Sequence, residues 1–279
     1  MMFGFDAIGS LDAASIVALS AIVFVGMPHG AMDGAMAMHF GWMNNISDAL
    51  KFLLSYISIS ILIVLIWQVL PVLSLILFLA ISIWHFGRGD TLEDSSFAKM
   101  AVESISRGGL VIAGISQFHK SESNKIFEFL VDGDATYVWH FLDAAAVVTI
   151  LAMVLSVVII YELRRLIIIF SELVLLSIVF FFAPPLLGFA IYFCLFHSLR
   201  HVKNMLPILK DTLSGFQISK LTIYLSIATW IIGIFAILQM SSTSNFEPVI
   251  IKIVFIGLAA LTVPHMILVD GYLERYAQS

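Results

Sequence analysis

The sequence predicts an all-α fold, a polytopic transmembrane bundle of about eight to nine helices, some of them broken by proline. Hydrophobic residues make up 61 % of the 279 residues and charged residues only 12 %, against about 45–50 % and 25 % in soluble domains. The mean hydropathy of +1.04 agrees with this class. The apolar runs are unbroken and do not alternate with polar residues, which favours helices over a β-barrel. We expect one integral-membrane domain over residues 1–279.

Apolar runs of helix length predict nine spans. In chain order they cover residues 11–27, 50–70, 71–86, 101–118, 137–160, 166–182, 186–203, 220–240 and 248–269. The first should be retained as a helix, because the N-terminus has no basic region typical of a signal peptide. Span 71–86 is short, and span 101–118 contains Glu103, Arg107 and two adjacent glycines. These two spans are the ones we expect to be tilted or half-inserted.

The basic residues predict which side of the membrane each loop faces. If nine spans alternate, eleven Lys and Arg lie nearer one face, namely Lys51, Arg88, Lys99, Arg107, Arg164, Arg165, Arg200, Lys203, Lys210, Lys220 and Arg275. Three lie nearer the other face, namely Lys120, Lys125 and Lys252. Because cytoplasmic loops are enriched in Lys and Arg, the C-terminus is expected in the cytoplasm and the N-terminus outside, in the inner (cytoplasmic) membrane of the cell.

The same alternation places five of the eight histidines near the cytoplasmic ends of spans: His29, His85, His197, His201 and His265. Ionisable residues inside membrane spans are rare and usually functional. The other three, His39, His119 and His140, fall near the outer face or after the first span, where an exposed interfacial histidine is ordinary. The sequence therefore predicts a functional site in the cytoplasmic half.

The stretch "FHSLRH" suggests metal chelation. His197 and His201 are four residues apart, so they lie on one helix face with Cβ atoms about 5–6 Å apart. "MPHG" and "WHFG" add His29 and His85 at the same expected depth. Four neutral imidazoles suit iron, copper, nickel or zinc and disfavour Mg or Ca. The single cysteine, Cys194, excludes a cysteine cluster and is more typical of a small buried apolar residue.

Two prolines lie directly before histidines. Pro28 should kink or stop the first helix and so aim His29, while Gly30 lets the backbone approach the site. Asp33 is placed to accept a hydrogen bond from a ligand imidazole, or alternatively to act as a helix cap. In "LTVPHMILVDG", His265 follows Pro264 and precedes Asp270. His265 is expected to support the site or to pack in the core more than to bind the metal.

The side chains around the histidines favour an apolar substrate. Phenylalanine and methionine are abundant, at 23 and 12 residues, and the candidate lining residues are Trp84, Phe86, Tyr192, Phe193, Phe196 and Met32. No P-loop, GxGxxG, GxSxG or HExxH motif occurs. A net charge of -5 without a basic stripe excludes nucleic acid as a partner.

Three other classes stay open from the residues alone. A membrane haem electron carrier would use histidines as axial ligands, although a pair four residues apart would crowd one face of the iron. A transporter would use His, Asp and broken helices, but the histidines gather at one face. A two-iron desaturase would need more histidine motifs than the single HxxxH present here.

Four motifs together resemble a known family. "GMPHGAMDG", "ISIWHFG", "APPLLGFAIYFCLFHSLRH" and "FIGLAALTVPHMILVD" resemble, in order and spacing, the Brp/Blh family of bacterial β-carotene 15,15'-dioxygenases. The resemblance implies an Fe(II)-dependent membrane enzyme that uses O2 to split β-carotene into two all-trans retinal molecules, which supply rhodopsins. It places the four iron ligands on His29, His85, His197 and His201.

The substrate that the resemblance implies also predicts the shape of the site. β-Carotene is a stiff rod roughly as long as the bilayer core is thick, about 30 Å. A site that holds both rings would set the central double bond over the metal. We therefore expect a long, mostly dry tunnel with openings to lipid. The oligomeric state is not predicted.

Overall fold

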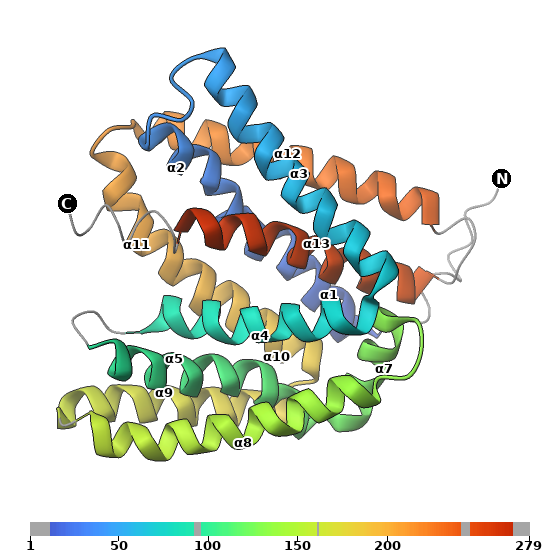
Figure 1. Ribbon diagram of the computed structural model, residues 1–279, viewed down its shortest axis with the longest axis vertical. Coiled ribbons are helices and arrows are strands. Elements are labelled where there is room, and N and C mark those ends of the chain that lie inside the picture. The colour runs from blue at the N-terminus through green and yellow to red at the C-terminus, as the bar shows by residue number, and fades with distance from the viewer. Residues whose placement is uncertain (1–11, 92–95, 161, 241–245, 270–279) are drawn as a thin grey trace. The chain divides into compact units, whose positions relative to one another are not determined.

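The computed structural model describes residues 12–91, 96–160, 162–240 and 246–269, and every regular element within these ranges is helical (Figure 1). This confirms the all-α prediction. Eight helices are long and apolar enough to cross a membrane: Ala13–His39, Ile46–Val69, Pro71–Asp90, Thr136–Ile159, Leu163–Phe182, Pro185–Lys210, Gly215–Met240 and Glu247–Leu268. They identify a multi-pass membrane protein.

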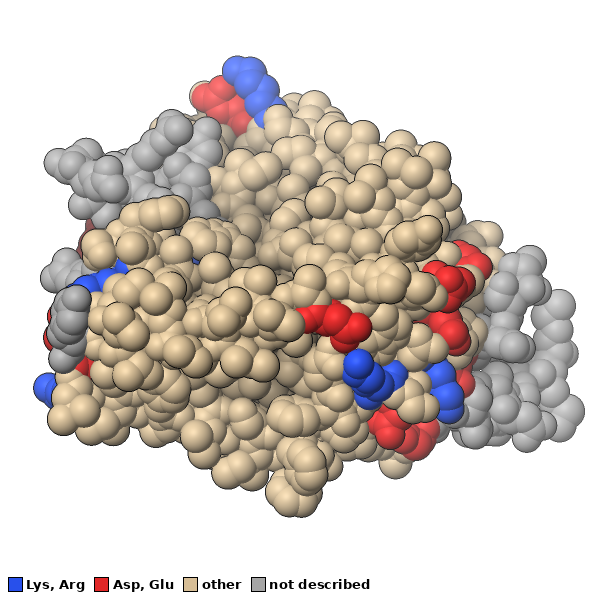
Figure 2. Space-filling view, turned by 60° about the horizontal axis from the view of Figure 1, so that its bottom comes forward, with Lys and Arg blue, Asp and Glu red and all other residues tan. Residues whose placement is uncertain are grey.

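The long helices expose large apolar side chains, as lipid contact requires. Leu54 and Leu65, both in the second helix of that set, are 62 % and 57 % exposed, and Phe235 of a later helix is 62 % exposed. In the space-filling view, uncharged residues cover most of the face and charged ones gather towards its edges (Figure 2). In water such a surface would aggregate, whereas in a bilayer it is the expected outer layer.

The contacts within the chain divide it into two compact units. Unit 1 contains residues 1–12, 19–70 and 201–279, and unit 2 contains residues 13–18 and 71–200. Two elements are divided between the units, the helix α1 (Ala13–Ala21) and the helix α11 (Leu199–Lys210). The expectation of a single membrane domain stays a prediction.

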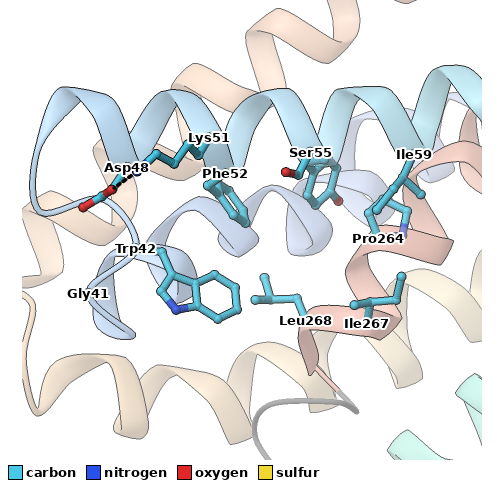
Figure 3. A pocket seen from close by; sticks show the side chains of 11 residues that line it. Gly41, Trp42, Asp48, Lys51, Phe52, Ser55, Ile59, Pro264, Ile267 and Leu268 are labelled. Atoms are coloured by element: carbon cyan, nitrogen blue, oxygen red, sulfur yellow. Dashed lines mark hydrogen bonds and ion pairs between the residues drawn. The ribbon is translucent and has the colours of Figure 1, made fainter.

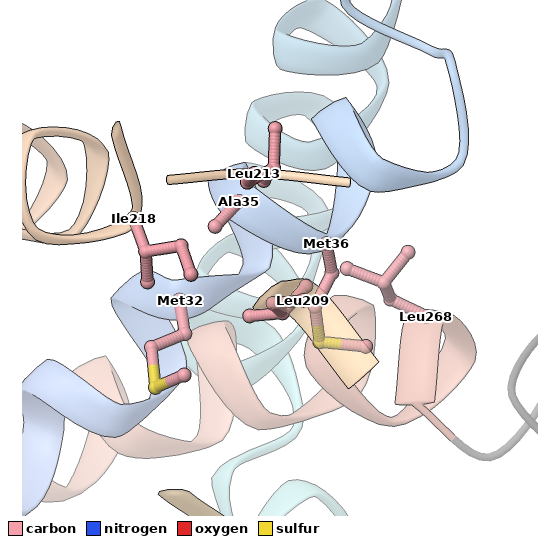
Figure 4. Close-up of a cluster of buried hydrophobic side chains, with 7 residues drawn as sticks. All are labelled: Met32, Ala35, Met36, Leu209, Leu213, Ile218 and Leu268. Carbon is pink, nitrogen blue, oxygen red and sulfur yellow. The ribbon is translucent and has the colours of Figure 1, made fainter. Parts of the chain in front are cut away.

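Unit 1 is built from α2 (Asp33–His39), α3 (Ile46–Val69), α12 (Gly215–Met240) and α13 (Phe246–Leu268). Helix α3 begins at Ile46, because the side chain of Asn45 accepts a hydrogen bond from the backbone N–H of Asp48 and caps the first turn. Helix α13 packs on α3, and α12 packs on α13 and α2. A buried apolar cluster joins these elements (Figure 4), and its members are Met32, Ala35, Met36, Leu209, Leu213, Ile218 and Leu268.

The first predicted span was expected to end at Met27, and this is wrong. The helix continues from α1 through a π-helical segment η2 (Ile22–Gly26) and a 3-10 segment η3 (Met27–Met32) into α2. Pro28 lies in the first turn of η3 but inside this continuous helix, so its missing N–H removes one intrahelical hydrogen bond. In the π-helical segment before it, the Val23 carbonyl oxygen accepts a hydrogen bond from the Trp230 indole N–H at 3.0 Å. The proline therefore changes the winding of the helix without ending it.

Unit 2 contains α4 (Pro71–Asp90), α5 (Phe97–Gly109), η4 (Leu110–Gly114), α6 (Ile115–Phe118), α7 (Lys120–Val131), α8 (Thr136–Ile159), α9 (Leu163–Phe182), α10 (Pro185–Ile191) and η5 (Tyr192–Ser198). Helix α5 packs between α4 and α8 (Figure 1). The α4–α5 contact is so close that a Cβ on Gly87 would lie 1.8 Å from the Ser104 carbonyl oxygen. A Cβ on Gly108 would lie 1.8 Å from the Ile83 carbonyl oxygen, so the two helices run antiparallel.

The two doubtful spans have different outcomes. The third is not short, because α4 runs for 20 residues to Asp90. The fourth, 101–118, forms α5, η4 and α6 but is not among the eight helices apolar enough to cross a membrane by themselves. Its charged residues, Glu103 and Arg107, lower its hydropathy. The two side chains are only 0 % and 3 % exposed, because neighbouring helices of the unit bury them.

Candidate functional site

Two histidines of unit 2 lie side by side. His85 is on α4 and His197 is on the π-helical segment η5, and their ring centroids are 5.1 Å apart at an interplanar angle of 68°. Both side chains are buried, at 4 % and 2 % exposure. π-Helical turns inside helices often occur at functional sites. Here the turn carries His197 on the helical face that meets α4.

Aromatic rings surround this pair. The Phe86 ring meets His197 edge to face at 4.8 Å, and the Phe193 ring stacks on His197 at 5.9 Å. Tyr192 lies 5.5 Å from Phe86. All three rings are buried, so the predicted lining residues Phe86, Tyr192 and Phe193 form an apolar wall beside His197.

Three histidines of unit 1 form a triangle. The ring centroids of His29, on η3, and His201, on α11, are 5.3 Å apart. His265, on α13, lies 5.6 Å from His29 and 5.1 Å from His201. His29 and His265 are buried and His201 is half-buried. His265 is therefore as close to its two neighbours as they are to each other.

Hydrogen bonds fix two of these rings. Nδ1 of His265 donates to Oδ1 of Asp33 at 2.8 Å, and the Tyr56 hydroxyl donates to Oδ2 of the same carboxylate at 2.8 Å. Nδ1 of His29 bonds the Gly26 carbonyl oxygen. Since Nδ1 is the donor in both rings, Nε2 is left as the nitrogen with a lone pair. Asp33 thus holds an imidazole, but its partner is His265, which the sequence does not place among the four expected ligands.

The donor set fits a transition metal. With a metal–nitrogen bond of about 2.1 Å, two imidazoles on one ion at a tetrahedral angle have ring centroids roughly 5 Å apart, which matches the pair and the triangle. Neutral buried imidazoles are good ligands for such ions. Among the described residues, no three His, Cys, Asp or Glu side chains meet the geometry of a metal site as they stand. The histidines come as a pair in one unit and a triangle in the other.

Comparison with known proteins gives the family. The model of the β-carotene 15,15'-dioxygenase family matches residues 20–272. The chain belongs to this family. A protein named beta-carotene 15,15'-dioxygenase, from uncultured marine bacterium 66A03, is 35 % identical over 256 residues, which cover 91 % of this chain and 92 % of that protein. No solved structure matches the chain. The match spans all five clustered histidines and confirms the resemblance seen in the sequence motifs.

Three further predicted residues of this β-carotene 15,15'-dioxygenase family member, Met32, Trp84 and Phe196, lie outside the two histidine groups. Met32 packs in the apolar cluster of unit 1. Trp84 and Phe196 are half-buried, and Phe196 stacks on Tyr192 at 6.4 Å. Cys194 is buried, as expected for a small apolar residue. Asp270 lies outside the described residues.

The three histidines expected at the interface have different surroundings. His140 is exposed. His39 is half-buried, and its Nδ1 lies 2.6 Å from the Thr212 hydroxyl. Nε2 of His119 donates to the Phe180 carbonyl oxygen at 2.8 Å. None of the three is in the pair or the triangle.

A chain of buried ion pairs in unit 2 was missed by sequence reasoning. The Tyr192 hydroxyl donates to Asp90 at 2.7 Å, and Asp90 pairs with Arg200 at 2.6 Å. The alternation of charges continues through Arg200–Glu172 at 2.7 Å, Arg107–Glu172 at 2.5 Å, Arg107–Glu103 at 3.0 Å and Arg165–Glu103 at 2.6 Å. Three carboxylates thus face three guanidinium groups. The signal in the sequence is the presence of charged residues such as Glu103, Arg107 and Glu172 within apolar spans.

Proposed function

We propose that this chain cleaves β-carotene at its central 15,15' double bond and gives two molecules of retinal. The observation that carries the proposal is the family match over residues 20–272, with a relative of that name at 35 % identity over most of both chains. The overall reaction balances with one O2, because each carbon of the broken double bond becomes an aldehyde carbon. The apolar, membrane-embedded character of the chain suits a substrate that dissolves in lipid.

We propose further that His29, His85, His197 and His201 hold one Fe(II) ion. The centroid spacing within the pair and the triangle supports imidazoles that converge on an ion. His197 and His201 are one turn apart on the helix Pro185–Lys210, which carries both. When bound, the iron would supply activation of O2 for addition to the double bond.

The residues of the chain prepare this chemistry. Asp33 accepts the Nδ1 hydrogen of His265 and so orients that ring beside His29 and His201. The carboxylate also adds a negative charge near a site whose proposed ligands are neutral. In unit 2, Phe86 and Phe193 cover His197 with apolar surface. Such a wall excludes water and binds a polyene by dispersion.

The proposed sidedness depends on the segment 97–118. With that segment crossing, the basic residues divide eleven to three; without it, the fourteen Lys and Arg of the chain divide seven to seven. The segment runs antiparallel to α4, which is itself long and apolar enough to cross. We therefore propose nine crossings, with the Arg-rich face and the C-terminus in the cytoplasm. Labelling of single cysteines on either side of intact cells tests this topology.

The function is tested with purified protein in detergent, loaded anaerobically with Fe(II), supplied with β-carotene and then exposed to O2. The expected product is retinal, two molecules per β-carotene consumed, and the expected metal content is one iron per chain. The double variant His197→Ala/His201→Ala should form no retinal and bind no iron. His39→Ala is the matched control and should retain both.

Three results would contradict the proposal. Apocarotenals of unequal length would indicate cleavage away from the centre. An intense Soret band would indicate haem in place of histidine-bound iron. Retinal formation that survives the loss of both His197 and His201 would remove the proposed ligands.

A further inference from the structure

A cavity of about 460 Å³ lies within unit 1, between α3, the turn after α2 and the end of α13 (Figure 3). Its size falls within the range of roughly 300–1,000 Å³ that is usual for small-molecule sites. Most of its lining is apolar, with Phe52 and Ile59 on the side of α3 and Trp42 and Leu268 opposite them (Figure 3). None of these four was among the lining residues predicted from the sequence.

The cavity is elongated along α3. Its lining runs from Asp48 to Ile59, a rise of roughly 16 Å at 1.5 Å per residue. Three aromatic side chains form a row along it: Trp42 and Phe52 have ring centroids 6.1 Å apart, and Phe52 and Tyr56 have centroids 5.9 Å apart. A row of rings at this spacing suits a flat, conjugated and apolar molecule.

One end of the cavity adjoins the histidine triangle. Tyr56 lines the cavity, and its hydroxyl donates to Asp33, which in turn holds His265. Pro264, which directly precedes His265, also lines the cavity. The opposite end carries the ion pair Asp48–Lys51, whose Lys51 side chain is 73 % exposed. The cavity therefore leads from the surface to the carboxylate that orients His265.

We propose that this cavity binds one ring-bearing half of a carotenoid, with the ring against Trp42 and Phe52 and the polyene directed past Tyr56 towards His265. The inference rests on the proposed function. One half of β-carotene is about 15 Å long, if the whole molecule matches the hydrocarbon core of roughly 30 Å. The lined stretch of α3 is about as long, so the cavity has room for one half of the molecule.

The test uses two serines of α3 that are both exposed and lie three residues apart. Ser55 lines the cavity, whereas Ser58 does not. Ser55→Trp should fill the cavity and weaken the binding of all-trans retinal and of β-carotene at least tenfold. Ser58→Trp adds the same side chain to the same helix and should change either affinity less than twofold. Binding is measured without iron and without O2, by titration of the full-length protein in detergent.

A second measurement locates the ring. Trp42→Leu should lower kcat/KM for β-carotene at least fivefold relative to a carotenoid whose ends are acyclic, because only a cyclic end occupies the space beside Trp42. Equal losses for both substrates would overturn the placement of the ring. Equal effects of Ser55→Trp and Ser58→Trp on retinal affinity would overturn the binding site itself, and would assign the cavity to membrane lipid.

The measurements of retinal binding distinguish this inference from the proposed function. If the wild-type protein forms no retinal from β-carotene but Ser55→Trp alone loses retinal affinity, the cleavage reaction fails and the binding site stands. If the wild-type protein forms retinal and the two tryptophan variants behave alike, the reaction stands and the binding site fails.

Discussion

The histidines of the two units are held by different means. In unit 1, a carboxylate and a tyrosine hydroxyl fix His265, and a backbone carbonyl bonds Nδ1 of His29. In unit 2, aromatic rings pack on His197 from two directions. Hydrogen bonds choose which ring nitrogen keeps its lone pair, whereas ring packing restricts position and excludes water. Hydrogen bonds therefore set the direction of the rings in the first unit, and aromatic packing encloses His197 in the second.

The polar groups of the two units are also used differently. In unit 1, Asp33 serves a histidine directly. In unit 2, Asp90 bonds Tyr192 and begins a chain of ion pairs that ends at Arg165. Ions buried away from water are stable only when paired and hydrogen-bonded. The carboxylate of Asp33 therefore orients a clustered histidine, whereas the carboxylates of unit 2 join helices through ion pairs.

The largest effect is expected when one proposed ligand is removed from each unit. His29→Ala in unit 1 and His85→Ala in unit 2 should each lower retinal formation more than a hundredfold and each lose nearly all bound iron. The reason is that a site with three of four imidazoles holds Fe(II) weakly. Iron per chain by elemental analysis, with retinal formation, measures both.

The same two variants also test whether the two units share one iron ion or hold one each. If each unit held its own ion, His29→Ala would retain the iron bound through unit 2, and the wild-type protein would contain two irons per chain. His39→Ala, a histidine outside both groups, is the control for loss of an imidazole. An unchanged iron content in either ligand variant would remove that histidine from the proposed set.

The next effect is on the stability of unit 2. Arg107 is 3 % exposed and pairs with Glu103 and Glu172. Arg107→Ala should lower the free energy of unfolding by about 3–5 kcal/mol, because it removes the cation between the buried carboxylate of Glu103 and the half-buried one of Glu172. Thermal unfolding in detergent measures this. Lys99→Ala, which breaks the more exposed pair with Glu162, should change the midpoint little, and an equal loss in both variants would contradict the structural role of the buried chain.

Much of the fold follows from hydropathy alone. Eight of the nine expected spans correspond to helices long and apolar enough to cross a membrane, because a 20-residue apolar run has few alternatives in lipid. The first span was ended too early at Pro28, since hydropathy does not report that a 3-10 turn accepts proline without breaking the helix. Span 101–118 was predicted to be doubtful because it contains charged residues. The ion-pair partners of these residues on α9 are distant in the sequence, so the sequence does not reveal the pairing.

The candidate site was predicted less completely than the fold. The five histidines were selected by depth and helical spacing, which are local properties of the sequence. Tyr56 was not selected, because nothing in "LLSYISI" shows that its hydroxyl meets Asp33, 23 residues away. The cavity beside Trp42 and Phe52 depends on how α3 and α13 pack, and that is a tertiary property with no signature in the sequence.

A smaller effect on stability distinguishes the glycines of the two units. A Cβ on Gly108 in unit 2 would lie 1.8 Å from a backbone oxygen of α4, while a Cβ on Gly30 in unit 1 would meet no atom within 4 Å. Gly108→Ala should therefore destabilise the protein by about 1–3 kcal/mol or more, and Gly30→Ala should not. Thermal unfolding of both variants tests this. If Gly30→Ala lowered activity at unchanged stability, the substrate or the metal, and not the protein, would need the space at Gly30.

The smallest effects are expected around Asp33, where changes alter only the direction of a ring. Asp33→Asn should lower iron affinity a few fold, because Asp33 orients His265, whose ring packs on the proposed ligands His29 and His201. Tyr56→Phe should lower it less than twofold, because it removes one of the two hydrogen bonds to the carboxylate and keeps the aromatic ring that lines the cavity. Both affinities come from iron titration under anaerobic conditions. KM for β-carotene should stay constant in Tyr56→Phe, so a raised KM with unchanged iron affinity would show that the hydroxyl serves the substrate and not the histidine.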